Sequence, residues 1–247
     1  MKSILITGCN RGIGLELVKQ LVFHKNAPPF ILATVRQPEK AKELNDLAQK
    51  NRNVHILKID LKDLNAYKEF SNDVSNILGG EGLNVLINNA GISAKFTRLN
   101  LVKAEQLQEH FLVNTIAPLM LTKALMPLIK KAAASNSSVP PSVSRGVIVN
   151  MSSILGSIAS NTTGGLYPYR TSKSALNAAT RSIGVEVKDD GIIAISLHPG
   201  WVKTDMGGSN APLTVEQSVS DIIKTLFSLE AKHNGQFIQH DGKDLPW

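Results

Sequence analysis

The sequence predicts an α/β protein built on one doubly wound, seven-stranded parallel sheet with helices on both faces. The first observation is that short apolar segments alternate along the chain with longer segments of helical periodicity. The second is that apolar residues follow one another within the short segments, as in residues 147–149, instead of alternating with polar ones. Strands without polar alternation are covered on both faces, as in a parallel sheet between two helical layers.

Seven segments have the length and composition of such strands. In chain order they are residues 3–7, 30–35, 54–59, 85–88, 147–151, 193–198 and 236–239. The segments between them are long enough to hold the helix that joins two parallel strands. We expect one of these helices over residues 172–187 and another near Thr214. Residues 132–145 depart from this rhythm, because they are rich in serine, asparagine and proline, and we predict a polar surface loop there.

All of these elements are expected to share a single domain over residues 1–247. The chain is long enough for one large core, and no Pro/Gly/Ser-rich linker divides it. Its 43% hydrophobic and 19% charged residues are ordinary for a soluble protein, and no apolar run approaches the roughly 20 residues of a membrane helix. We therefore predict no membrane span.

The charged residues and the cysteine content indicate which partners and which cellular location to expect. The net charge of +7 comes from scattered basic residues that form no block, so no nucleic acid partner is expected. An N-terminus without an export signal and a single cysteine, Cys9, agree with a cytoplasmic location. Cys9 precedes an expected helix, where it is either a reactive thiol or a small residue fitted beside a ligand. We predict no metal site.

A glycine-rich loop follows the first strand. Gly8, Gly12 and Gly14 lie between that strand and an expected helix. Backbone amides without side chains can approach a pyrophosphate, and the N-terminus of a helix attracts its negative charge. The loop predicts a dinucleotide site on a Rossmann fold, although its Gly-x-x-x-Gly-x-Gly spacing departs from the general fingerprint.

Tyr169 and Lys173 are the second chemical feature of the chain. Residues four apart share one face of a helix, so the ammonium group is expected beside the phenol. A phenol normally titrates near pH 10, and an ammonium group together with the positive charge of a nicotinamide would lower its pKa. Hydride transfer needs a fixed dinucleotide and a separate acid, so the two features together predict a nicotinamide-dependent oxidoreductase.

With Thr7 before it, the glycine loop resembles that of the short-chain dehydrogenase/reductase family. Other landmarks of this family follow in order along almost the whole chain: Asn88-Asn89-Ala90-Gly91, Asn114, Ser152-Ser153, Tyr169-x-x-x-Lys173 and Pro199-Gly200. The resemblance implies that Tyr169 is the acid in reduction and the base in oxidation, and that Ser153 binds the substrate oxygen. It also implies that Lys173 holds the nicotinamide ribose. Asn114 would interrupt its helix and hold a water molecule for proton relay, the alternative being an ordinary helical asparagine.

The end of the second strand indicates which nicotinamide dinucleotide is bound. An acidic residue there would hold a ribose hydroxyl, whereas this chain has Arg36, and Arg11 offers a second guanidinium group for phosphate oxygens. We therefore predict NADP(H). Asp60 either contacts the adenine or caps a helix. By resemblance, the cofactor site comprises Gly8, Asn10, Arg11, Gly12, Ile13, Gly14, Arg36, Asp60, Leu61, Asn88, Ala90, Gly91, Asn114, Tyr169, Lys173, Pro199, Gly200, Val202 and Thr204.

The segment after Pro199-Gly200 belongs to the substrate side of the site. Residues 201–213 are expected to form a short lid, whose glycines permit movement. The predicted substrate pocket comprises Ser153, Ile154, Tyr169 and Trp201, although Ile154 and Trp201 could equally pack in the core. Residues 161–165 lengthen the interval between Ser153 and Tyr169, and we expect a small insertion at the rim of the pocket.

Residues 7–12, 167–177 and 241–247 resemble the sniffer-type carbonyl reductases within the same family. This resemblance implies NADPH-dependent reduction of aldehydes and ketones, a small-molecule substrate and a homodimer. Two alternatives are an NADP-dependent alcohol or hydroxysteroid dehydrogenase that works oxidatively, and a non-catalytic NADP(H)-sensing protein, since fold alone does not determine function.

Overall fold

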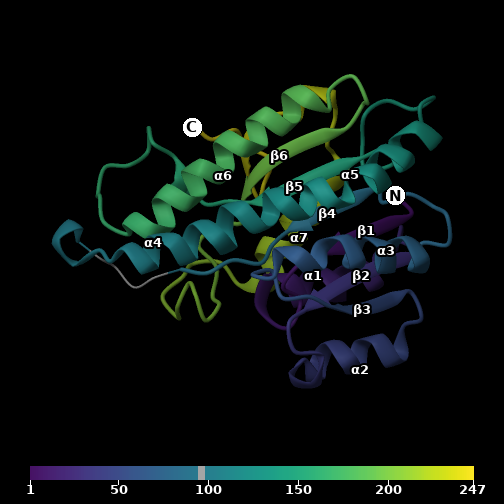
Figure 1. Cartoon of the computed structure of the whole chain (residues 1–247), viewed down its shortest axis with the longest axis horizontal. Coiled ribbons are helices and arrows are strands. Elements are labelled where there is room, and N and C mark those ends of the chain that lie inside the picture. The colour runs from purple at the N-terminus through teal and green to yellow at the C-terminus, as the bar shows by residue number, and fades with distance from the viewer. Residues whose placement is uncertain (94–97) are drawn as a thin grey trace.

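A computed structural model of the chain describes residues 1–93 and 98–247. Within them the strands form one seven-stranded sheet in which all neighbouring pairs are parallel, in the order β3-β2-β1-β4-β5-β6-β7 (Figure 1). The strands are β1 (Ser3–Ile6), β2 (Phe30–Val35), β3 (Val54–Lys58), β4 (Val85–Asn88), β5 (Val147–Met151), β6 (Ile193–His198) and β7 (Phe237–Gln239). The predicted doubly wound sheet is confirmed, and each predicted strand ends within one residue of its observed limit.

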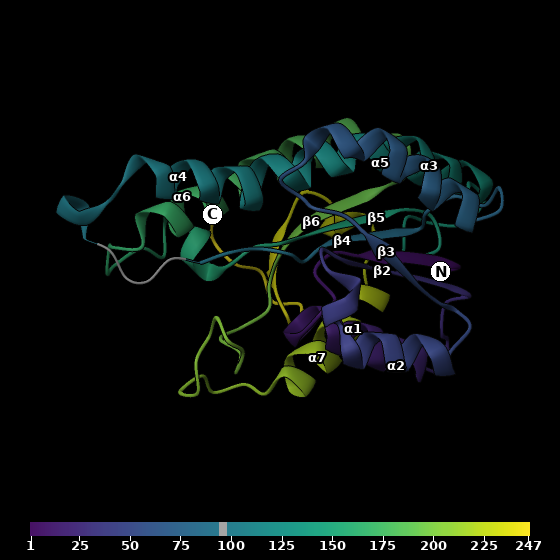
Figure 2. The same ribbon diagram turned by 60° about the horizontal axis from the view of Figure 1, so that its bottom comes forward.

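Two layers of helices cover the sheet (Figures 1 and 2). One layer contains α1 (Gly12–Val22), α2 (Lys42–Lys50) and α7 (Val215–Phe227), and the other contains α3 (Tyr67–Ile77), α4 (Ala104–Phe111), α5 (Ala117–Ser135) and α6 (Tyr167–Glu186). Alternate residues of one strand pack against opposite layers: Ile4 and Ile6 share a core with α1, whereas Leu5 shares a core with α3 and α5. All three side chains are fully buried, which explains the uninterrupted apolar strands.

One helix corrects the prediction that no segment is apolar and long enough to span a membrane. α4, the π-helical turn Leu112–Ile116 and α5 follow one another without a break, and the resulting helix, Ala104–Ser135, passes that test by length and composition. Half of its most apolar window is buried inside the protein. Leu121 and Leu125 are fully buried in the core beside the sheet, so this helix is apolar because it is a core helix.

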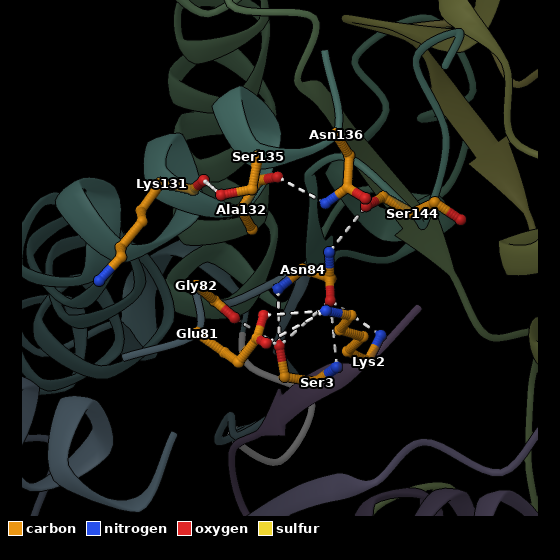
Figure 3. A network of polar contacts seen from close by, with 10 residues as sticks. All are labelled: Lys2, Ser3, Glu81, Gly82, Asn84, Lys131, Ala132, Ser135, Asn136 and Ser144. Atoms are coloured by element: carbon orange, nitrogen blue, oxygen red, sulfur yellow. Dashed lines mark hydrogen bonds and ion pairs between the residues drawn. The ribbon is translucent and has the colours of Figure 1, made fainter. Parts of the chain in front are cut away.

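The predicted loop over residues 132–145 begins later than expected. α5 continues to Ser135, and Ala132 is buried. The hydroxyl of Ser135 donates to the carbonyl of Lys131 at 2.9 Å, and the side-chain amide of Asn136 donates to the carbonyl of Ala132 at 2.9 Å (Figure 3). The first polar residues of this segment therefore bind the last carbonyls of the helix, which otherwise lack partners.

Asn84 fastens the amino edge of the sheet (Figure 3). Its side-chain oxygen accepts hydrogen bonds from the backbone amides of Lys2 and Ser3 at 2.8 and 3.1 Å, and its side-chain nitrogen donates to the carbonyl of Ser144 at 2.8 Å. The hydroxyl of Ser3 donates in turn to the carbonyl of Gly82 at 2.8 Å. One buried side chain thus ties the starts of β1 and β4 to the loop before β5, at the edge opposite the carboxyl ends of the strands.

Candidate active site

The glycine loop begins at the carboxyl end of β1, beside β4, where the strand order reverses. Gly8 and Gly12 have φ angles of +72° and +56°, in the left-handed region that favours glycine. A side chain on Gly14 would approach the carbonyl oxygen of Gly8 to 2.2 Å, so α1 packs directly against the loop. The backbone amide of Cys9 donates to the carbonyl of Thr34 at 2.9 Å. These contacts fix the first turn of α1 at the edge of the sheet.

Thr7 joins this loop to the segment after β4. Its hydroxyl accepts a hydrogen bond from the backbone amide of Ala90 at 3.0 Å, and its carbonyl accepts one from the side-chain amide of Asn89 at 2.8 Å. The backbone amide of Thr7 donates to Ile87 at 3.0 Å. These hydrogen bonds join the glycine loop to residues 89–90, so the segments that follow β1 and β4 are held together at the carboxyl ends of the two strands.

Cavities follow this carboxyl edge. The glycine-loop cleft has a volume of about 470 Å³, and the β2 pocket, beside the end of β2, has a volume of about 370 Å³. The Tyr169 pocket has a volume of about 600 Å³. Tyr169 lines both the glycine-loop cleft and the Tyr169 pocket, so its side chain lies where the two meet.

Most residues predicted to bind the cofactor line these cavities. The glycine-loop cleft is lined by Gly8, Asn10, Arg11, Gly12, Ile13, Gly14, Ala90, Gly91, Tyr169, Lys173, Pro199 and Thr204. The β2 pocket is lined by Arg36, Asp60 and Leu61, and the Tyr169 pocket by Gly200 and Val202. Residues far apart in sequence thus meet along one edge.

Asn88 and Asn114 lie behind these walls. The side-chain amide of Asn88 donates to Asn150 at 2.8 Å and to Thr122 at 3.0 Å, in the buried region between neighbouring strands. Asn114 lies in the π-helical turn, where its amide group exchanges hydrogen bonds of 2.9 Å with the backbone of Ile92. The predicted interruption of the helix is present, and both asparagines hold site segments in place.

The ammonium group of Lys173 is buried beside the carboxyl end of β5. Its Nζ donates to the carbonyl oxygen of Met151 at 2.7 Å and lies 5.8 Å from the centroid of the Tyr169 ring. Burial lowers the pKa of Lys173 to about 8. A side chain on Gly91 would lie 3.5 Å from this Nζ and 3.2 Å from Oδ1 of Asn114, so the glycine keeps space open beside the ammonium group.

The hydroxyl of Tyr169 forms a hydrogen bond with the side chain of Ser153. Burial raises the pKa of Tyr169, and this hydrogen bond opposes the rise. The direction is opposite to the predicted lowering, because loss of hydration disfavours the phenolate more than the surrounding groups of the chain favour it. Tyr169 therefore keeps its proton at neutral pH. The Oγ of Ser153 also accepts a hydrogen bond from the backbone amide of Leu155 at 3.1 Å, which orients it.

The Tyr169 pocket contains the four residues predicted to meet the substrate, Ser153, Ile154, Tyr169 and Trp201. Trp201 is 55% exposed, and its Nε1 donates to the carbonyl of Gly207 at 2.8 Å. The alternative of core packing is therefore wrong for Trp201, which is held within the 201–213 segment.

Two arginines at the rim of the site bind residues of neighbouring segments through their side chains. Nη1 of Arg11 lies 2.5 Å from Oδ2 of Asp205 in the 201–213 segment, and both side chains are largely exposed. Such a pair contributes at most about 1 kcal/mol, so the guanidinium group remains available to a stronger anion. Arg170 donates from Nη2 to the hydroxyl of Thr163 at 2.9 Å, which fastens the 161–165 segment.

Comparison with known proteins agrees with this geometry. The sequence pattern of the family described as short chain dehydrogenase matches residues 2–212. The chain belongs to this family. A Schizosaccharomyces pombe protein, described as uncharacterized oxidoreductase C663.06c, is 32% identical over 268 residues, which cover 100% of this chain and 98% of the relative. The chain is therefore a short-chain oxidoreductase.

Solved structures of carbonyl reductases resemble this short-chain oxidoreductase over its whole length. The carbonyl reductase Sniffer of D. melanogaster is 53% identical, with a TM-score of 0.99 and coverage of 100% of both chains. The NADPH-bound carbonyl reductase from chicken fatty liver is 40% identical, with a TM-score of 0.94 and coverage of 100% of this chain and 99% of that one. The predicted family and its sniffer-like character are confirmed.

Some residues that line the site of this short-chain oxidoreductase were not predicted. They include Asn89, Ser152 and Lys203 in the glycine-loop cleft, Lys40 in the β2 pocket and His198 in the Tyr169 pocket. His198 ends β6 directly before Pro199. The general rule that ligands bind at the carboxyl ends of parallel strands was a signal that could have found it.

Cys9 is a structural residue of the glycine loop. Its side chain is fully buried, and its Sγ lies 3.1 Å from the carbonyl oxygen of Ile6. Burial raises the pKa of its thiol, so the reactive thiolate form is disfavoured. Of the two predicted alternatives, the small buried residue is the one that the structure supports.

Proposed function

We propose that the protein is an NADPH-dependent carbonyl reductase that converts aldehydes and ketones to alcohols. The observation that carries this proposal is the position of Tyr169. It keeps its proton, bonds to Ser153, lies near Lys173, and lines both the glycine-loop cleft and the neighbouring pocket. An acid at such a junction can meet an oxygen whose carbon receives a hydride.

The glycine-loop cleft and the β2 pocket fit a phosphorylated dinucleotide. Gly8, Gly12 and Gly14 add no side chains to the cleft at the N-terminus of α1, and Gly91 leaves space beside Lys173. The β2 pocket is lined by Arg11, Arg36 and Lys40, whose positive charges suit a ribose 2′-phosphate. The names of similar structures add support, because the chicken reductase is described as NADPH-bound.

NADPH would supply the hydride in this reaction. Tyr169 donates its phenolic proton to the carbonyl oxygen as the hydride reaches the carbonyl carbon, and Ser153 donates a hydrogen bond to the same oxygen. The phenolate left on Tyr169 is stabilised by the ammonium group of Lys173. Because its raised pKa keeps Tyr169 in the acid form, it can donate the proton that reduction needs.

The remaining roles follow from the same arrangement. Lys173 binds the nicotinamide ribose, and Asn114 holds the water that passes a proton toward Lys173. Asn114 supports this role through its place in the π-helical turn, beside the same open space as Nζ of Lys173. We also propose that the 201–213 segment is a lid over the site, that the protein acts in the cytoplasm, and that it forms a homodimer.

The first test compares wild type with Tyr169→Phe. NADPH and NADH absorbance is followed with a panel of quinones, dicarbonyls and aromatic aldehydes. We expect Tyr169→Phe to lose about 100-fold or more in kcat while NADPH affinity changes little, because only the acid is removed. Tyr167→Phe, two residues before Tyr169 at the start of α6 and outside both cavities, is the matched control. NADPH binding by wild type without turnover of any panel member would favour the cofactor-sensing alternative.

A second test addresses the cofactor. Arg36→Ala should weaken NADPH binding by about tenfold to 100-fold and leave NADH binding nearly unchanged, because a charge-assisted hydrogen bond to the 2′-phosphate is lost. Fluorescence titration gives both dissociation constants. Arg52→Ala, which removes an exposed arginine at the amino end of β3, is the control. An equal effect of Arg36→Ala on NADPH and NADH would show that Arg36 does not read the phosphate.

A further inference from the structure

His198 places a polar group in the Tyr169 pocket that the reaction described above does not use. It is the last residue of β6, lines the pocket together with Ser153 and Tyr169, and is only 9% exposed. The backbone amide of Ser152, at the end of β5, donates to the carbonyl of Leu197 at 2.7 Å. This bond holds the ends of the two strands side by side, so the imidazole and the Ser153 hydroxyl face one pocket.

The imidazole of His198 lacks hydrogen-bond partners within the described residues. Its Nδ1 is a buried atom with no partner. Its Nε2 forms no hydrogen bond either and is not among the fully buried atoms, so Nε2 is the ring nitrogen that can reach the pocket. A ligand atom in the pocket can therefore supply the hydrogen-bond partner that Nε2 lacks within the described residues.

Other polar side chains of this pocket are already engaged. The hydroxyl of Ser152 donates to Asn177 at 2.6 Å, and the hydroxyl of Thr204 accepts from the backbone amide of Gly207 at 3.0 Å. Ser153 bonds to Tyr169. His198 is thus a free hydrogen-bonding group placed next to the pair that holds the reacting oxygen.

The surroundings of His198 keep its ring neutral. Burial, together with a smaller effect of the neighbouring His240, lowers the pKa of His198 to about 4. Nδ1 of His240 lies 3.4 Å from the carboxylate of Asp221. A neutral imidazole with its proton on Nε2 donates one hydrogen bond, which suits a carbonyl oxygen and does not require a charged ligand.

We infer that His198 binds a second oxygen of the substrate, so that the pocket prefers compounds with two neighbouring carbonyl groups over simple ketones. Ser153 follows β5, His198 ends the paired strand β6, and both line one pocket, so a single ligand can offer one oxygen to Ser153 and Tyr169 and another to His198. The hydride and proton still go to a single carbonyl, and His198 transfers no proton. This inference rests on the proposed carbonyl reductase function.

The test uses 1-phenyl-1,2-propanedione and propiophenone, which differ by one carbonyl oxygen. The specificity ratio is kcat/KM for the dione divided by kcat/KM for the ketone. In His198→Leu this ratio should fall about tenfold relative to wild type, mainly through KM of the dione, because one hydrogen bond is lost. His198→Gln, whose amide nitrogen can replace Nε2, should restore most of the ratio. NADPH affinity and thermal midpoint show whether each variant is folded.

A second readout needs no turnover. The imidazole ¹⁵N signals of the wild-type protein with NADP⁺ are followed by NMR, and His198→Leu assigns the signal of His198. The dione should shift that signal, whereas propiophenone should leave it unchanged.

The two readouts separate the inference from the proposed function. If wild type reduces both compounds and His198→Leu keeps the wild-type ratio within twofold, the inference is overturned while the reductase proposal stands. If wild type reduces neither compound, the reductase proposal fails for this substrate class, and the NMR signal decides the inference. A shift specific to the dione supports the second contact, and an unchanged His198 signal overturns it.

Discussion

Raising the pH should stabilise the wild-type protein relative to a Lys173→Met variant. Burial lowers the pKa of Lys173 to about 8 in the folded chain, compared with about 10.4 for a lysine in an unfolded chain. Between these values the unfolded state binds more protons than the folded state, so the free energy of unfolding rises with pH. The penalty for burying the ammonium group is fully present below about pH 8 and falls progressively as the pH rises from the folded pKa of about 8 to the unfolded pKa of about 10.4.

The size of the effect follows from the two pKa values. Each pH unit over which the folded and unfolded states differ by one proton contributes about 1.4 kcal/mol. Integration from about pH 7 to about pH 9.5 gives a relative stabilisation of about 2 kcal/mol. This range ends below the region where Tyr169, whose pKa burial raises, would add an effect of opposite sign.

The assay is urea unfolding of both proteins at several pH values in this range, with the difference in unfolding free energy as the measured quantity. Lys188→Met removes an exposed lysine just beyond α6 and is the matched control. The difference in unfolding free energy between wild type and Lys188→Met should stay constant with pH. A difference between wild type and Lys173→Met that is equally constant with pH would refute the conclusion that burial controls this ammonium group.

Two further substitutions test the edges of the sheet. Asn84→Ala should lower the free energy of unfolding by about 2–3 kcal/mol, since the part-buried amide of Lys2 and the buried amide of Ser3 lose their acceptor. The kcat of the folded fraction should be unchanged, and urea unfolding with activity assays checks both. Gly91→Ala should weaken NADPH binding at least tenfold while lowering stability by about 1 kcal/mol, because the added methyl group enters the space beside Lys173 at ordinary contact distance and only the side-chain oxygen of Asn114, at 3.2 Å, must shift slightly. Fluorescence titration tests the second substitution, and wild-type affinity would contradict the proposed position of the cofactor.

Local sequence patterns were sufficient to predict the strands of the sheet and the helices that carry the site. The seven apolar segments without polar alternation predicted strands buried on both faces, and each strand is present. Gly8, Gly12 and Gly14 predicted a loop that joins the first strand to a helix, and the structure has this loop, with angles and contacts that only glycine tolerates. The helix that carries Tyr169 and Lys173 was also predictable from its periodicity, although α6 begins before residue 172, at Tyr167.

Other features depend on how distant segments pack. The sequence placed Asn88 and Asn114 at the cofactor, but the structure shows each side chain bonded to neighbouring strands or loops. The polar residues after 132 predicted a loop, yet the core packing of α5 extends the helix to Ser135. Local polarity cannot reveal such outcomes, because hydrogen-bond partners and buried surface come from residues far away in the chain.

The sequence by itself determined the fold class, the family and the identity of the main chemical groups, since strand patterning, glycine positions and the Tyr169–Lys173 spacing are all local. Only the tertiary structure decided the protonation of that pair and the presence of His198 in the pocket. The physical reason is that a pKa shift and an unpaired ring nitrogen both depend on burial. Burial is created when α6, β5 and β6 come together at one edge of the sheet.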